Sequence, residues 1–87
     1  MYVIAAYDVS VERITKVHAL LGQYLHRKQN SLFEGELTKS KLEELKIRLE
    51  NMIDLGTDKV IIYCLPSISI LDKICIGQQS DEKMMIM

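Results

Sequence analysis

Two runs of apolar residues limit what this 87-residue chain can fold into, because neither run leaves a polar face for solvent. Tyr2–Tyr7 is almost continuously apolar, and in Lys59–Leu65 both alternating sets of side chains are apolar after the lysine. Short runs of this kind predict strands that are buried on both sides. Helices can cover one face of such a sheet, and too few residues remain to cover the other. We therefore expect a homodimer that packs sheet face against sheet face.

A first helix is predicted over Val11–Leu25, where apolar residues recur at steps of three and four. Ser10 is placed to act as its N-cap residue. Glu12 and Arg13 are expected to face solvent. The helix follows directly on the first strand, so the residues between them form a short loop at one end of the sheet.

A second helix is predicted within Leu37–Gly56, capped by Thr38 or Ser40 and followed by Gly56 as the residue after its C-terminus. Between the helices, Arg27–Leu37 is long enough for one bent strand or for two short strands broken near Gly35.

The order of elements predicts an α+β fold of the ferredoxin-like βαββαβ type. Residues 1–77 would form this domain, and 78–87 a flexible tail. A further strand over Leu71–Ile76 is predicted to add to the partner subunit's sheet, which would protect the edge of that sheet.

Composition excludes several classes of protein. The net charge of −1 gives no overall basic surface, and no apolar stretch approaches the roughly 20 residues of a membrane span. The N-terminus lacks the basic segment of a signal peptide, so we expect a cytoplasmic protein. Cys64 and Cys75 alone provide neither a disulfide framework nor metal-ligand spacing, and we interpret them as buried, reduced thiols.

Asp8 is the first charged residue and ends the first predicted strand. It could cap the following helix, but Ser10 is already available for that role. If a dimer axis passes nearby, two copies of Asp8 approach each other, and paired carboxylates either share a proton or bind a cation. Mg²⁺ suits one or two carboxylates with water and phosphate oxygens. A twofold pair of Asp8 residues would therefore suit one Mg²⁺ between them, and a metal held there could activate water for attack on a phosphodiester.

Basic residues cluster between the first strand and the centre of the chain: Arg13, Lys16, Arg27 and Lys28. Such a cluster could bind the phosphate backbone of DNA or RNA, or it could be an ordinary solvated surface. His18 and His26 are interpreted as surface residues, which leaves no histidine beside Asp8 to act as a base.

The segments "MYVIAAYDVS" and "QNSLFEGEL" together resemble the family of CRISPR-associated protein two, and the similarity extends over about Met1 to Gly77. The resemblance implies a ferredoxin-like homodimer whose C-terminal strands cross to the partner. It also implies that Asp8 contributes to an interfacial Mg²⁺ site and to phosphodiester cleavage. Lys16 and Arg27 match basic positions of the family.

Three further positions match residues beside the family's dimer cleft: Tyr7, Ser31 and Phe33. The resemblance implies a metal-dependent endonuclease acting on RNA or double-stranded DNA. It also implies a bridge between dimers of CRISPR-associated protein one, the integrase of spacer acquisition. Two alternatives remain open from the sequence: a non-catalytic DNA-binding scaffold of that complex, and a related small toxin-type ribonuclease.

Overall fold

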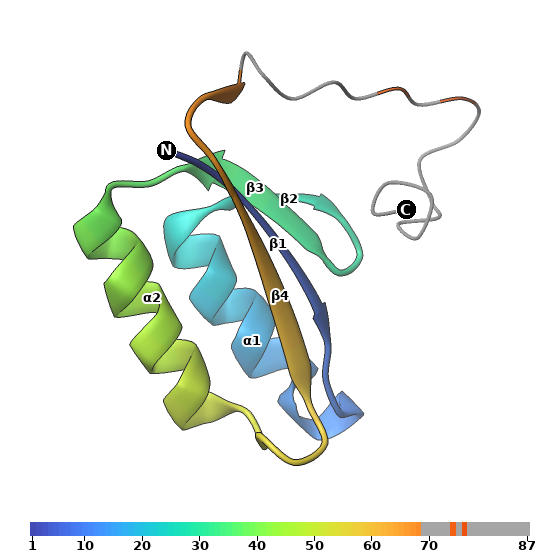
Figure 1. The fold of residues 1–87 in the computed structure, drawn as a ribbon. Helices are drawn as coiled ribbons and strands as arrows, with labels where there is room; N and C mark the ends of the chain where they lie inside the picture. Colours follow the sequence, from blue (N-terminus) through green and yellow to red (C-terminus); the bar gives the residue numbers. More distant parts are fainter. Residues whose placement is uncertain (69–73, 75, 77–87) are drawn as a thin grey trace.

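The computed structural model describes residues 1–68, 74 and 76. It shows a four-stranded sheet with two helices on one side (Figure 1). The elements in chain order are β1 (Tyr2–Asp8), α1 (Val11–Tyr24), β2 (His26–Gln29), β3 (Leu32–Glu36), α2 (Lys39–Met52) and β4 (Lys59–Leu65). The strands lie in the order β2-β3-β1-β4, and every neighbouring pair is antiparallel. The ferredoxin-like α+β fold is confirmed. The predicted strand at Leu71–Ile76 and the predicted tail lie outside the described residues, apart from Ile74 and Ile76.

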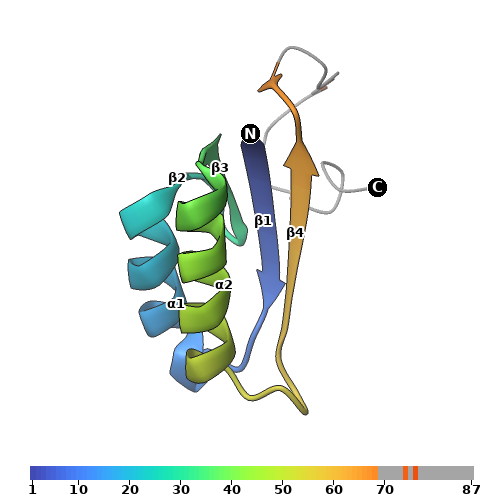
Figure 2. The same ribbon diagram turned by 60° about the vertical axis from the view of Figure 1, so that its left-hand side comes forward.

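The hydrophobic core lies between the sheet and the two helices, which cover the same face of the sheet (Figure 2). Its fully buried members include Val3 and Ala5 from β1, Leu20 and Leu21 from α1, and Leu45 from α2. Neither helix in the described part of the chain is long and apolar enough to cross a membrane.

The segment between the helices forms two strands, and the break falls at Asn30 and Ser31 rather than near Gly35. Gly35 lies inside β3, where a Cβ atom would be 3.2 Å from Cδ2 of Leu25 and 3.5 Å from its Cα. The glycine therefore serves close packing of the chain against β3, not a bend. The irregularity in pairing lies in β2, between Arg27 and Gln29.

The two helix starts differ in how they are capped. Of the two predicted cap residues, Thr38 caps α2, since its Oγ1 accepts a hydrogen bond from the Lys41 amide at 3.1 Å. Ser10 occupies the N-cap position of α1, but its side chain makes no capping hydrogen bond. The helix α2 ends at Met52 with Ile53 as the C-cap, so the prediction for Gly56 was wrong. Gly56 instead lies in the following turn and donates its amide hydrogen to Asp54.

The face of the sheet away from the helices, which we call the open face, is largely apolar along β1 and β4. Residues paired across two strands share a face, and the pairs Ile4–Tyr63 and Ala6–Ile61 lie on this one. Tyr63 is 40% exposed. No helix of the described chain covers the open face, as the apolar runs predicted (Figure 2).

The prediction for Cys64, in β4, was wrong. The residue was predicted to be a buried thiol, but it is free and exposed. The reason is its strand: within residues 1–68, β4 lies at the edge of the sheet and has a strand neighbour on one side only. Cys75 lies outside the described residues.

Candidate functional site

Asp8 is the last residue of β1 and pairs with Lys59, the first residue of β4. The alternation of a strand places it on the open face, in line with Ile4 and Ala6. Its side chain is exposed, and within residues 1–68 its carboxylate makes no hydrogen bond or ion pair. Asp8 is therefore free to bind a ligand at one end of the open face.

The donor set of one chain is small for a metal ion. Among the described residues there is no group of three or more His, Cys, Asp or Glu side chains that could hold one. Mg²⁺ is commonly bound by only one or two carboxylates, with water and substrate oxygens completing its shell. The residue type of Asp8 thus fits Mg²⁺, and a second Asp8 from another copy would give the usual pair.

Tyr2 and Glu34 form a polar contact further along the open face. The Tyr2 hydroxyl donates to a Glu34 carboxylate oxygen at 2.7 Å, and Glu34 is buried. Burial first, and then this carboxylate, raise the pKa of Tyr2 to about 12. Tyr2 therefore stays protonated and acts as a hydrogen-bond donor at physiological pH.

Tyr7 and Phe33 lie on the opposite face of the sheet from Asp8, against the helices. Their ring centroids are 6.4 Å apart, and both rings contact the His18 ring, at 5.3 and 5.8 Å. The Tyr7 hydroxyl donates to the Asn30 carbonyl at 2.8 Å, and its amide donates to the Ser31 carbonyl at 3.2 Å. These contacts tie the end of β1 to the β2–β3 turn, so they hold the backbone next to Asp8 in place.

His18 was predicted to be a surface residue, and the structure shows otherwise. The residue is half-buried, and its Nε2 is buried without a hydrogen-bond partner among the described residues. Burial, and then the charge of Arg27, lower the pKa of His18. The ring is therefore a neutral member of the aromatic cluster. The prediction that His26 is exposed is confirmed.

Three of the four predicted basic residues are exposed: Lys16 on α1, and Arg27 and Lys28 on β2. The Arg27 guanidinium donates to the Gln29 and Asn30 carbonyls, each at 3.3 Å. These contacts hold Arg27 beside the β2–β3 turn. The three cations are accessible to a phosphate backbone.

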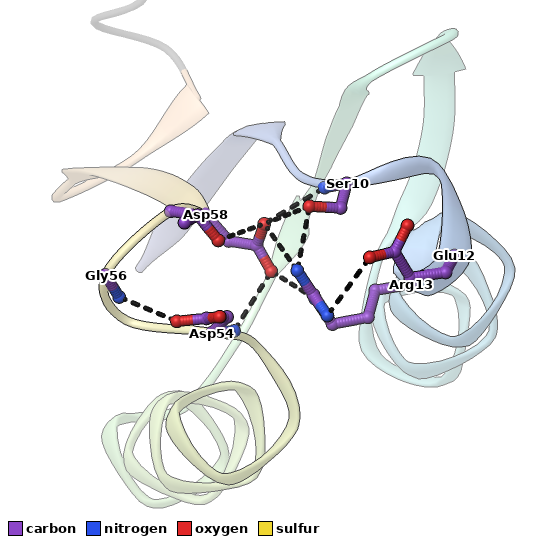
Figure 3. A network of polar contacts seen from close by, with 7 residues as sticks. Ser10, Glu12, Arg13, Asp54, Gly56 and Asp58 are labelled. Carbon is purple, nitrogen blue, oxygen red and sulfur yellow. Dashed lines mark hydrogen bonds and ion pairs between the residues drawn. The ribbon is translucent and has the colours of Figure 1, made fainter.

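Arg13 differs from the other three, because its guanidinium is engaged inside the protein (Figure 3). It bonds through Nε and Nη2 to the Asp58 carboxylate, and Nη2 also donates to Ser10 Oγ at 2.8 Å. The Arg13 side chain is only 22% exposed, so the expectation that it faces solvent was wrong. A role for this residue in binding phosphate would compete with its ion pair.

Asp58 is an acidic residue that the sequence patterns did not single out. Its side chain is fully buried, and it immediately precedes Lys59, the pairing partner of Asp8. The hydrogen bond from Arg13, which outweighs burial, holds the pKa of the Asp58 carboxyl well below its usual range, and backbone amides of Asp54 and Ser10 add to this effect. Asp58 is therefore ionised at physiological pH. The only signal in the sequence was an acid in the loop before a strand, which is a common feature.

Comparison with known proteins gives one consistent result. The model of a family described as CRISPR associated protein Cas2 matches residues 1–72. The chain is 49% identical over 67 residues to the CRISPR-associated endoribonuclease Cas2 of Thermococcus kodakarensis, covering 77% of this chain and 79% of the relative. It is 52% identical over 63 residues to the CRISPR-associated endoribonuclease Cas2 2 of Archaeoglobus fulgidus, covering 72% and 68% of the two chains.

Solved structures agree with this match. A crystal structure of cas2 superimposes with a TM-score of 0.82 at 47% identity, covering 90% of this chain and 87% of that chain. The crystal structure of Streptococcus pyogenes Cas2 at pH 6.5 gives a TM-score of 0.69 at 37% identity, covering 75% and 86%.

Proposed function

The chain belongs to the CRISPR-associated Cas2 family, and from this premise we propose that it is a homodimeric, Mg²⁺-dependent endonuclease of CRISPR adaptation. The observation that carries the proposal is Asp8: an exposed carboxylate that makes no hydrogen bond or ion pair within residues 1–68, at the end of an apolar open face. Relatives are named endoribonucleases, which favours RNA as a substrate. Double-stranded DNA is the second substrate we propose.

The open face links the dimer to the chemistry. Two copies that bury their apolar β1 and β4 residues together would bring the two Asp8 side chains towards each other. Together they would hold one Mg²⁺. When bound, this ion supplies Lewis-acid activation of water and neutralises charge on the phosphate. The protein's own part is to hold two carboxylates in place and to bind the backbone of the substrate.

Removal of the metal tests this proposal. We expect the purified protein to cleave end-labelled RNA, or duplex DNA of the same sequence, in Mg²⁺, and to cleave neither in EDTA. Restoring Mg²⁺ should restore cleavage. Equal cleavage in EDTA and in Mg²⁺ would contradict a metal-dependent site, and a parallel assay of each substrate identifies the one that is used.

A second function, bridging the integrase known as CRISPR-associated protein one on DNA, is favoured by the exposed cations Lys16, Arg27 and Lys28. Such a scaffold needs binding to the phosphate backbone without cleavage. One carboxylate per chain is a small catalytic apparatus, so both roles are compatible with the same surface.

Charge reversal tests the binding surface. We expect Lys16→Glu with Arg27→Glu to weaken duplex DNA binding by about tenfold or more near 0.15 M salt. The magnitude of the salt slope should fall by about one for each phosphate that the protein no longer neutralises. Lys41→Glu with Lys46→Glu is the matched control, because it also reverses two charges, and both lysines lie on α2, where they pair with Glu44 and Glu43. An equal decrease of affinity in the control, or binding that does not depend on salt, would contradict this interface.

A further inference from the structure

The Asp58 carboxylate joins two loops at the end of the molecule where Asp8 lies (Figure 3). From the loop between β1 and α1 it accepts hydrogen bonds from the Ser10 amide at 3.0 Å and the Ser10 hydroxyl at 3.1 Å. From the segment between α2 and β4 it accepts the Asp54 amide at 3.0 Å. The Arg13 guanidinium also donates to this carboxylate, as does the Thr57 hydroxyl at 3.5 Å. One buried carboxylate therefore fixes two backbone segments relative to α1.

The position of Asp8 depends on its backbone, because its own side chain has no polar partner in the described part of the chain. On one side Asp8 is held by the ladder between β1 and β4, where it pairs with Lys59. Two residues further along the chain, the Ser10 amide donates to Asp58 and so holds the loop that follows Asp8. Asp58 also directly precedes Lys59 in the chain. These two supports of the Asp8 backbone thus converge on Asp58, whereas the hydrogen bond from the Tyr7 amide to the Ser31 carbonyl holds the same strand end against the β2–β3 turn.

An apolar side chain could not replace this arrangement. Substituting a buried ion pair by apolar residues often costs little, but here the carboxylate also accepts two backbone amides that would be left without a partner. The planar guanidinium of Arg13 meets the carboxylate through two nitrogen atoms, a geometry that a lysine ammonium cannot reproduce. The chemistry of both residues is therefore specific to holding these loops.

We propose that Asp58 and Arg13 are positioning residues for Asp8: they fix the loop after β1 so that the Asp8 carboxylates of a dimer lie at the separation one Mg²⁺ requires. This inference rests on the proposed metal-dependent dimer. It assigns to Arg13 a role in orientation, in place of the direct phosphate contact that its charge alone suggests.

The test measures metal binding apart from activity, in Asp58→Asn and Arg13→Lys. Mn²⁺ is the probe, titrated while free ion is followed by electron paramagnetic resonance, with the dimer fraction and melting temperature measured on the same samples. We expect both variants to need about tenfold more Mn²⁺ for half-saturation, the usual size of effect for residues that orient a ligand. Cleavage should show the same shift in its Mg²⁺ requirement and recover at high Mg²⁺.

Arg48→Gln is the matched control. Arg48 donates to the Tyr24 hydroxyl at 2.9 Å and to Gln23 at 3.0 Å, which ties α2 to the C-terminal end of α1, far along the helix from Ser10. This substitution should lower the melting temperature without changing Mn²⁺ half-saturation.

Wild-type half-saturation in folded Asp58→Asn and Arg13→Lys would overturn the inference and leave a purely structural ion pair. If Asp58→Asn does not fold, Arg13→Lys decides alone, since it keeps the positive charge and changes only the two-point contact. The Asp8→Asn variant separates the proposed metal site at Asp8 from the positioning role of Asp58 and Arg13. Unchanged Mn²⁺ binding in that variant removes the proposed site itself, whatever Asp58 does.

Discussion

Replacing Asp8 by asparagine is expected to abolish Mg²⁺-dependent cleavage and to leave the fold unchanged. The side chain is exposed and has no polar partner within residues 1–68, so stability should change by less than about 0.5 kcal/mol. The substitution removes the charge of both carboxylates in a dimer at once. If metal assistance contributes about 3 kcal/mol or more to transition-state stabilisation, the rate should fall by at least about 100-fold. The measurement is initial cleavage rate at saturating Mg²⁺.

Glu50→Gln is a suitable control for this variant. Glu50 is an exposed acid on α2, which packs against the other face of the sheet, and its replacement changes the net charge by the same amount. We expect it to cleave at close to the wild-type rate. Equal rates for Asp8→Asn and the wild type would show that the carboxylate is not part of the reaction, and would favour the DNA-binding scaffold.

The fold could be predicted because its determinants are local in sequence. The apolar runs of β1 and β4 specify their strands, and the three- and four-residue steps specify the helices. Thr38 caps α2 through an amide only three residues away. Gly35 could not be interpreted in this way. Its role depends on Leu25, which lies ten positions earlier, and a glycine in a strand pattern does not reveal what approaches it.

The site could be predicted only in part, for the same physical reason. Asp8 is recognisable because it interrupts an apolar run at a strand end. The pairing of Arg13 with Asp58 joins residues 45 positions apart, and each looks like an ordinary surface charge in the sequence. His18 was also misjudged, because its burial comes from Tyr7 and Phe33 on two different strands. Charge and polarity in a sequence do not indicate whether a partner lies nearby in the folded chain.

Tyr63→Lys is expected to convert the protein to a monomer and to abolish cleavage with it. Tyr63 lies on the open face opposite Ile4 and is 40% exposed in the single chain. In a dimer that buries this face, an unpaired ammonium there would lose its hydration, at a cost of about 4 kcal/mol or more. That cost raises the dissociation constant of the dimer by about 1000-fold. Light scattering at micromolar concentration measures the decrease in dimer, and the cleavage assay measures its consequence.

Ile47→Lys provides the comparison that makes this result specific. Ile47 is 57% exposed on α2, which packs against the other face of the sheet, so a lysine there should leave both the dimer and the activity unchanged. If the site is formed by one Asp8 from each of two copies, activity must follow the dimer fraction. The cleavage rate of Tyr63→Lys should then rise more steeply than its protein concentration. A monomeric variant that cleaves as fast as the wild type would show that one Asp8 is sufficient, and a wild-type monomer would remove the basis for pairing two.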